Sequence, residues 1–230
     1  YIETTTPTVT IYDIPLGHIY DFNVRVICAT DKKSGWSPTQ NFIVDIPYWT
    51  DIVDKQPEGF TIDTTGNVTI SSAEGLAWLG VLVHGLHGQT AQSFANKEIT
   101  LANNISLAGY RWRPIGHVDN PFSGHVDGNN FAISNLYVNE TATPAGLFGR
   151  IDDGSLKNIN LVSGKVSTMG GNDDSAGGLA GLLSNCTEVS NCHAAVEVHG
   201  IVEVGSLVGE VENLLGDKTL VTNCSASGSA

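Results

Sequence analysis

The sequence predicts an all-β protein, most of which is a stacked solenoid. Two short motifs recur along its second half, always in the same order: Gly-Leu-x-Gly, and then an Asn followed by Ile or Cys at 158–159, 191–192 and 223–224. Gly-Leu-x-Gly motifs occur at 145–149 and 177–181, and a third copy at 205–209 has Ser206 in place of the first glycine. Leu147 and Leu179 are 32 residues apart, and Leu179 and Leu207 are 28 residues apart. A drifting period of about 20–50 residues is typical of solenoids, because each repeat is one supersecondary unit that gains stability by stacking on its neighbours.

The composition excludes several classes of function. The chain has 230 residues, with 24 acidic and 11 basic side chains and a net charge of −13. This charge repels phosphate backbones and anionic lipids, so we expect neither nucleic-acid binding nor membrane-surface binding. No apolar run approaches the roughly 20 residues that span a bilayer, so we expect no membrane insertion by this segment. The chain begins at Tyr1 without a signal-like segment, and we expect a piece of a longer protein with other domains.

Acidic residues concentrate toward the C-terminus. The segment 168–230 holds eight acidic residues and one lysine. A solvated acidic face is the expected explanation. The alternative is a cation site, but the sequence contains no Asp-x-Asp-x-Asp-Gly calcium loop.

The first fifty residues carry strand patterns. Residues 20–27 mostly alternate apolar and polar side chains, as in a strand with one buried face. Shorter strands are expected at 8–12 and 41–44, with a turn at 14–17 and a polar loop at 31–35.

This segment resembles the last three strands of a fibronectin type III domain. The likeness rests on the turn from Ile14 to Tyr20, on the alternating strand, and on Gly35-Trp36-Ser37. It implies that Tyr20 is the tyrosine-corner residue, whose hydroxyl hydrogen-bonds to the backbone upstream. We therefore assign residues 1–50 to a partial fibronectin type III-like β-sandwich that lacks the earlier strands. The resemblance implies a spacer without catalytic residues.

One helix is expected near Ser72–Leu86. Ser71 or Ser72 suits the N-cap, Glu74 suits the first turn, and apolar residues follow at helical spacing. An uncovered solenoid end exposes its core and a rung of unpaired backbone groups, so we expect this helix to cap the N-terminal end. No comparable segment follows Cys224, and we expect the C-terminal end to be truncated or weakly capped.

Short strand-like runs follow the helix. They are 98–101, 104–107, 131–138, 154–162, 166–168, 189–198 and 221–224. Two structural ladders are expected along the solenoid axis, one of inward leucines and one of corner asparagines. The first comprises Leu147, Leu179 and Leu207, and the second comprises Asn135, Asn158, Asn191 and Asn223. Stacked amides can hydrogen-bond along the axis and Asn tolerates left-handed backbone angles, whereas glycines are expected where a Cβ would clash.

The Gly-Leu-x-Gly repeats resemble GLUG motifs, and the region before them strengthens the likeness. It is carried by the segments 99–107, 112–116 and 122–136, in that order. The resemblance covers about residues 60–230 and implies a right-handed parallel β-helix. We therefore assign residues 51–230 to a GLUG-type β-helix. Its repeats are expected over about 98–230. The family occurs in adhesin-like secreted and surface proteins of bacteria and beside the catalytic domains of IgA-specific metallopeptidases. It implies no catalytic, cofactor-binding or metal-binding residue, and Asn103-Asn104 stands where an Asp is common.

The predicted function is a non-catalytic binding, adhesion and display module of a bacterial protein that is secreted or at the cell surface. A stiff β-helix with a fibronectin-like spacer suits adhesion, by analogy at the level of the fold. The expected partner is an unknown protein or glycan. The possible ligand contacts are Tyr110, Arg111, Trp112 and Arg113, which lie outside the coil pattern. For Trp112, a place in the core is the stronger interpretation.

Two alternatives stay open. Parallel β-helices often carry polysaccharide lyases and glycosidases, and glycosidases need a pair of carboxylates across the scissile bond. The available pairs are Asp152-Asp153 and Asp173-Asp174, but adjacent strand residues point to opposite faces and both pairs lie in Gly-rich turns. A groove with three or more convergent carboxylates and a basic residue would favour such an enzyme. The other alternative is an accessory stalk of a larger secreted peptidase.

The histidines and cysteines show no metal-binding pattern. His84 and His87 lack the spacing of a zinc-binding helix and are expected at the surface near a helix end. The four cysteines, Cys28, Cys186, Cys192 and Cys224, form no Cys-x-x-Cys pair. Cys192 and Cys224 follow ladder asparagines one period apart, so stacking would place their Cα atoms about 5 Å apart. Side chains that stack in parallel seldom meet the torsion of a disulfide, so we expect four free thiols.

Overall fold

The computed structural model describes residues 18–29, 32–141, 143–169, 175–213, 216 and 218–229. The chain divides into two compact units, residues 1–46 and 47–230. Residues 47–50, which the sequence analysis placed in the first unit, belong to the second because the Trp49 side chain is buried there. The indole nitrogen of Trp49 donates a hydrogen bond to the Leu107 carbonyl at 2.9 Å.

Within its described residues, 18–29 and 32–46, the first unit has two short antiparallel pairs of strands. The strands are β1 (His18–Phe22) with β4 (Gln40–Val44), and β2 (Ile27–Ala29) with β3 (Lys32–Lys33). The Tyr20 ring stacks on its cross-strand partner Phe42, with 5.6 Å between ring centroids. The strand predicted at 20–27 is interrupted, because the backbone amides of Val24 and Val26 bond to serine hydroxyls of the opposite segment. The strand predicted at 8–12 lies outside the described residues, and the fibronectin resemblance stays a prediction.

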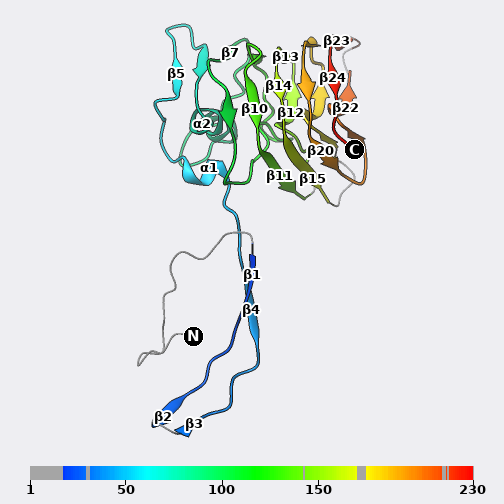
Figure 1. Cartoon of the computed structure of the whole chain (residues 1–230). Coiled ribbons are helices and arrows are strands. Elements are labelled where there is room, and N and C mark those ends of the chain that lie inside the picture. Colours follow the sequence, from blue (N-terminus) through cyan, green and yellow to red (C-terminus); the bar gives the residue numbers. More distant parts are fainter. Residues whose placement is uncertain are drawn as a thin grey trace. The chain divides into compact units, whose positions relative to one another are not determined.

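The second unit is a parallel β-solenoid of about five turns (Figure 1). Its largest sheet has the order β23-β18-β13-β9-β7-β6-β5, in which only the β5–β6 pair is antiparallel. These strands are β5 (Phe60–Ile62), β6 (Val68–Ile70), β7 (Glu98–Leu101), β9 (His125–Asp127), β13 (Ser155–Lys157), β18 (Glu188–Ser190) and β23 (Leu220–Thr222). The predicted parallel β-helix is therefore confirmed.

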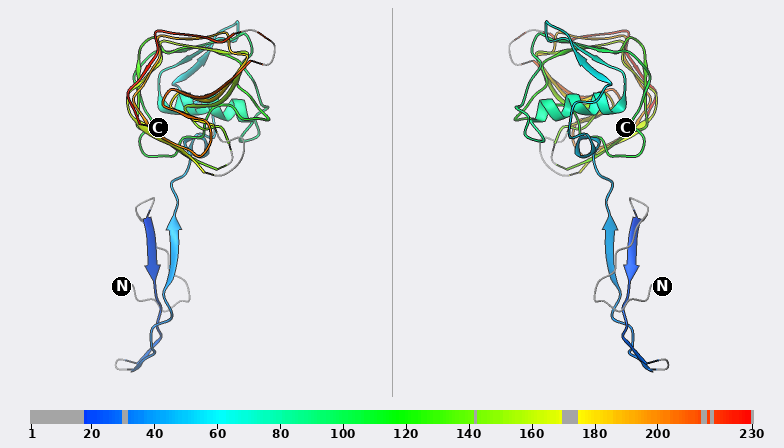
Figure 2. Two further views of the ribbon diagram at one scale, coloured as in Figure 1. Left: turned by 90° about the vertical axis from the view of Figure 1, so that its right-hand side faces the viewer. Right: turned by 90° about the vertical axis from the view of Figure 1, so that its left-hand side faces the viewer.

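Four smaller parallel sheets complete the coil, and the turns superpose when seen from its ends (Figure 2). The five-stranded sheet contains β8 (Ile105–Ser106), β10 (Ala132–Ser134), β14 (Asn160–Leu161), β19 (His193–Ala194) and β24 (Ser225–Ala226). The others are β11 (Leu136–Glu140), β15 (Gly164–Thr168) and β20 (Glu197–His199); β12 (Phe148–Asp152), β17 (Ala180–Ser184) and β22 (Val208–Glu212); and β16 (Ala176–Gly177) with β21 (Val204–Gly205).

Columns of inward apolar side chains form the core. On the largest sheet these are Ile99, Val126, Leu156 and Val189, all of which are buried. Each such burial contributes about 1.5–3 kcal/mol. In the last turn the in-register residue Val221 is 49% exposed. The predicted weak capping of that end stays a prediction.

Left-handed residues form corners that split several predicted strands. The run 131–138 is divided at Asn135 (φ 59°), and the run 154–162 is divided at Asn158 (φ 53°). Asn191 (φ 53°) divides the run 189–198 in the same way. Asn accepts this backbone region more readily than other non-glycine residues, so each asparagine lets the chain turn from one sheet to the next.

The repeated glycines serve close packing of backbones. In Gly-Leu-x-Gly, the last glycine of the second copy is Gly181, and a Cβ added there would lie 2.5 Å from the Ala145 backbone nitrogen. The last glycine of the third copy, Gly209, would place its Cβ 2.6 Å from the Ala176 nitrogen. These positions exclude any side chain, as the sequence analysis expected.

Helix α2 (Ala73–His84) lies at the N-terminal end of the solenoid (Figure 1). The Ser72 hydroxyl accepts a hydrogen bond from the Gly75 amide, and Gly85 (φ 66°) ends the helix. Residues 75–83 are all buried, so the helix is enclosed on all sides and has no solvent-facing polar stripe. Among the described residues, no helix is long and apolar enough to span a bilayer. That α2 acts as a cap against end-to-end association stays a prediction.

A second, shorter helix lies close to α2. It is α1 (Trp49–Ile52), which directly follows the start of the second unit.

Candidate functional site

An open groove crosses the outer face of the seven-stranded sheet. Its volume is about 350 Å³, and four successive turns of the solenoid line it. The lining residues are Glu98, His125, Val126, Asp127, Ser155, Lys157, Thr187 and Glu188. A larger hollow of about 510 Å³ lies beside the start of α2, but the residues around it, such as Ser72, form a turn and the helix cap. The groove is therefore the candidate site.

In-register stacking creates the groove from residues that are far apart in the sequence. Each strand contributes two outward polar side chains on either side of one inward apolar residue. One outward column contains Glu98, His125, Ser155 and Glu188, and the other contains Thr100, Asp127, Lys157 and Ser190. The two-residue period of a strand places both columns on the same face.

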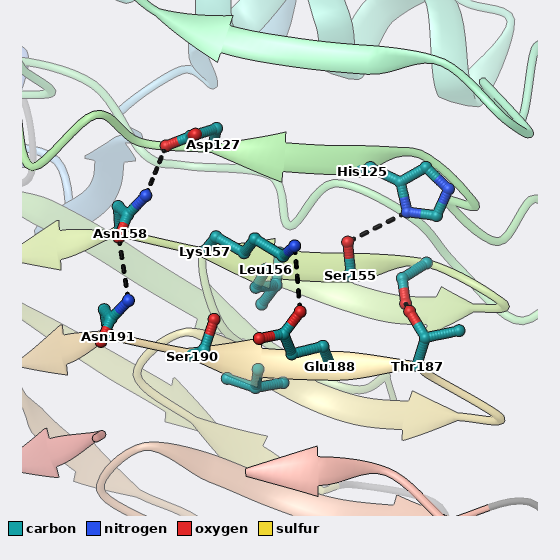
Figure 3. Close-up of polar contacts among 12 residues, drawn as sticks. His125, Asp127, Ser155, Leu156, Lys157, Asn158, Thr187, Glu188, Ser190 and Asn191 are labelled. Carbon is teal, nitrogen blue, oxygen red and sulfur yellow. Dashed lines mark hydrogen bonds and ion pairs between the residues drawn. The ribbon is translucent and has the colours of Figure 1, made fainter. Parts of the chain in front are cut away.

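Hydrogen bonds and an ion pair join neighbouring turns across the groove (Figure 3). His125 Nδ1 lies 3.0 Å from Ser155 Oγ. Lys157 Nζ lies 2.9 Å from Glu188 Oε2. At the edge of the groove, Asn158 Nδ2 donates to Asp127 Oδ1 at 2.9 Å. The polar groups of the groove are thus held in place, because each of their strands is joined to the neighbouring turns.

Carboxylates dominate the electrostatics of the groove. Glu98, Asp127 and Glu188 face a single lysine, Lys157. The hydrogen bond from Lys157 lowers the pKa of Glu188, and the same bond raises the pKa of Lys157. Both members of this pair are therefore charged at neutral pH, and the groove carries an excess of negative charge.

Three residues of the groove, Ser155, Lys157 and Glu188, have surroundings that disfavour a role in proton transfer. Ser155 is only 4% exposed and its hydroxyl is bonded to His125, so an attacking serine would be out of reach of a substrate. A lysine with a raised pKa is a poor general base, and a glutamate with a lowered pKa is a poor general acid. The groove can instead accept hydrogen bonds and attract positive charge.

This groove was not predicted from the sequence. Its residues follow no local motif, because they are about one solenoid turn apart. A usable signal was present, however: the triplets Glu98–Thr100, His125–Asp127, Ser155–Lys157 and Glu188–Ser190 are each polar, apolar and polar. Stacking these triplets would have brought the polar columns together.

The predicted ligand contacts at residues 110–113 do not line the groove. Trp112 is 1% exposed, and its indole nitrogen donates to the Leu147 carbonyl at 2.9 Å. The proposal of Trp112 as a ligand contact is therefore wrong, and its alternative place in the core is the observed one. The half-buried ring of Tyr110 packs edge-on against Trp49, with 4.8 Å between ring centroids.

The two arginines of this segment bind residues of the chain itself. The guanidinium carbons of Arg111 and Arg113 lie 4.5 and 4.2 Å from the centroid of the Tyr48 ring. Arg113 also contacts Asp51, with 3.5 Å between the charged atoms. Burial raises the pKa of Glu140, which accepts a hydrogen bond from Tyr48. This cluster fastens the start of the second unit to the solenoid.

The asparagine ladder contains three of the four predicted members. Asn191 Nδ2 donates to Asn158 Oδ1 at 3.2 Å, and Asn223 Nδ2 donates to Asn191 Oδ1 at 3.3 Å. Asn135 is at a different corner, where its Nδ2 donates to Ser106 Oγ at 3.1 Å. Its predicted stacking on Asn158 is wrong because 23 residues separate the two, which is less than one turn.

The leucine ladder lies in the core. Leu147 and Leu179 are 1% and 0% exposed, and Leu207 is half-buried in the last turn. Their backbones are linked from turn to turn, since the Leu179 amide donates to the Leu207 carbonyl at 2.9 Å.

The two carboxylates of the acidic pair Asp152-Asp153 have different surroundings. Asp152 forms an ion pair with Arg150 at 3.8 Å, whereas Asp153 forms a left-handed corner (φ 59°). Asp173-Asp174 lies outside the described residues.

The two histidines near the end of α2 make different contacts. His84 is half-buried, its Nε2 lies 2.9 Å from the Pro114 carbonyl, and burial lowers its pKa. Its expected surface location is therefore only partly right. His87 is exposed, and its Nε2 lies 2.7 Å from the Thr50 carbonyl.

Sequence comparison finds relatives that share only part of their length with this chain. Halomucin of Haloquadratum walsbyi is 33% identical over 112 residues, which is 45% of this chain and 1% of halomucin. A protein of Evansella cellulosilytica named "Putative Gly-rich membrane protein" is 33% identical over 91 residues, which is 39% of this chain and 10% of that protein. No protein-family model and no solved structure matches the chain. The GLUG and fibronectin resemblances therefore stay predictions.

Proposed function

We propose that this chain is a binding and display segment of a cell-surface protein, and that the groove on the seven-stranded sheet holds its ligand. The observation that carries the proposal is the convergence of polar side chains from four turns on one rigid face. Each strand pairs with the strands of the turns before and after it, so these side chains are held in fixed positions. Less conformational entropy is therefore lost when a ligand binds. The names of the two relatives, a halomucin and a membrane protein, support a location at the cell surface.

The charges of the groove indicate the class of ligand. Three carboxylates face one lysine, and Glu188 neutralises that lysine. An anionic chain such as a uronate polymer would be repelled, whereas a neutral or amino-bearing glycan offers hydroxyl and ammonium donors to the carboxylates. We therefore propose a neutral or amino-bearing glycan as the ligand.

A glycan array tests this proposal. The chain should bind neutral or amino-bearing glycans. The double variant Glu98→Gln/Glu188→Gln should lose at least about tenfold in affinity, since two carboxylate contacts worth about 1 kcal/mol each are weakened. The matched control is Lys165→Ala/Glu197→Gln, which removes a second Lys–Glu contact between adjacent turns, outside the groove. Preference for uronates, or equal losses in both double variants, would rule the groove out.

A polysaccharide-cleaving enzyme is the second candidate. It is favoured by one observation, because the groove has the three convergent carboxylates and the basic residue that such an enzyme would need. Incubation of the chain with the glycans that it binds, followed by measurement of new reducing ends, separates the two candidates. Turnover that Glu98→Gln or Asp127→Asn abolishes would establish catalysis, whereas bound and uncleaved glycan supports the binding module.

A further inference from the structure

Two cysteines occupy equivalent positions on adjacent turns, away from the residues that line the groove. Cys192 follows Asn191 and Cys224 follows Asn223, and the strands on either side are in register. Cys192 is 1% exposed, and Cys224 is half-buried and packs against the core. Both are free thiols, as is Cys186.

The two thiols have the same orientation, displaced by one turn. Cys192 Sγ donates to the carbonyls of Ser190 (3.3 Å) and Leu156 (3.7 Å). Cys224 Sγ donates to the carbonyls of Thr222 (3.2 Å) and Val189 (3.5 Å). The acceptors correspond as well, because Leu156 pairs with Val189 and Ser190 pairs with Thr222. Equivalent atoms on adjacent turns of a parallel coil are about one strand spacing apart, which is about 4.8 Å, and the two sulfur atoms are equivalent in this sense.

This separation distinguishes between two chemistries. A disulfide requires sulfur atoms about 2.05 Å apart with a torsion near 90°, so at least one thiol would have to leave its present orientation. A metal ion bound between two thiolates with bonds of about 2.3 Å each requires sulfur atoms about 4.6 Å apart when the three atoms are collinear. The stacked pair fits the second arrangement without a rotamer change.

The surroundings limit the ion to one that accepts two ligands. Among the described residues, no group of three or more His, Cys, Asp or Glu side chains is placed to share a metal ion. Zinc normally takes four protein or water ligands and is disfavoured in a buried site with two. Soft thiolate ligands select Cu(I) among the common biological metals.

We propose that Cys192 and Cys224 form a two-coordinate site for a soft monovalent ion, with Cu(I) as the natural occupant. One Cu(I) ion replaces two thiol protons, and no electron is transferred. Burial raises the pKa of Cys192 to about 12, and the nearby Cys224 thiol adds to this rise. Affinity therefore increases with pH, because the ion must displace these protons.

The proposal is tested by titrating Cu(I), in the absence of oxygen, into the reduced 230-residue chain with a Cu(I)-chelating dye as competitor. All proteins carry Cys28→Ser, so that the three cysteines of the solenoid are compared. We expect one equivalent of Cu(I) to be retained, and Cys224→Ser to weaken binding by about 100-fold or more because the second thiolate acts at a high effective concentration. Cys192→Ser should have the same effect, and Cys186→Ser, which removes a buried thiol outside the pair, should have none.

Several results would overturn the proposal. One is that the parent chain does not retain Cu(I). Another is that Cys186→Ser weakens Cu(I) binding as much as Cys192→Ser or Cys224→Ser. A third is that Cys224→Ser binds Cu(I) as tightly as the parent chain. Circular dichroism of each variant checks that it is folded. Cys224→Ser is the substitution that the fold tolerates best, because Cys224 is half-buried in the last turn.

Discussion

The asparagine ladder permits a quantitative test of what holds the corners of the solenoid. Asn191 has a left-handed backbone (φ 53°), donates to Asn158 and accepts from Asn223. Replacing it with Ala removes two exposed hydrogen bonds, worth about 0.5 kcal/mol each at the low end of the usual range. Ala must also adopt the left-handed conformation, which costs about 1–2 kcal/mol. Asn191→Ala should therefore lower the free energy of unfolding by about 2–3 kcal/mol.

Asn191→Gly separates the two contributions. Gly loses the same hydrogen bonds but adopts the left-handed conformation without strain, so its cost should be about 1–2 kcal/mol, part of which is the greater entropy of the unfolded chain. Urea unfolding followed by tryptophan fluorescence measures both variants, and a constant slope m shows that the comparison is valid. Equal costs for Ala and Gly would refute the argument that backbone strain selects asparagine at this corner.

Three further predictions concern the core, the ion pair and the thiols. Leu179→Ala should cost about 3–4 kcal/mol in urea unfolding and Leu207→Ala about 1–2 kcal/mol, because Leu179 is fully buried and Leu207 half-buried; equal costs would contradict this. The pKa of Glu188 is lowered from 4.5 by Lys157, so its stabilising contribution is complete above pH 4.5 and is lost as the pH falls through the lowered value. The melting temperature of Glu188→Gln should therefore fall less on acidification than that of the parent chain. If both melting temperatures fall equally with pH, the Lys157–Glu188 pair does not contribute to stability. Burial raises the pKa of Cys186 and Cys192 to about 12, so of the three cysteines in the solenoid iodoacetamide at pH 8 should label Cys224 first, as peptide mass spectrometry would show; equal labelling rates for these three would contradict the burial.

The elements with local signals could be predicted from the sequence alone. Ser72 as a helix cap and the apolar spacing after it were sufficient to place α2 within two residues of its observed ends. The spacing of the Gly-Leu-x-Gly and Asn motifs was sufficient to predict a stacked solenoid, and the resemblance to GLUG repeats implied that its strands are parallel. These features depend on neighbouring residues or on the recurrence of a motif, and both are visible in a single sequence.

The register between turns was decided only by the tertiary structure. On the seven-stranded sheet, Ile99 lies beside Val126, which lies beside Leu156, at intervals of 27 and 30 residues, and the next interval, from Leu156 to Val189, is 33. Because the turn lengths vary, no fixed period assigns a residue to its neighbour, and Asn135 was placed on the wrong corner. The groove depends on this register throughout, since Glu98, Asp127 and Lys157 meet only after three turns have stacked. The sequence by itself determined that the chain would coil, whereas the packing of successive turns determined which side chains meet on its surface.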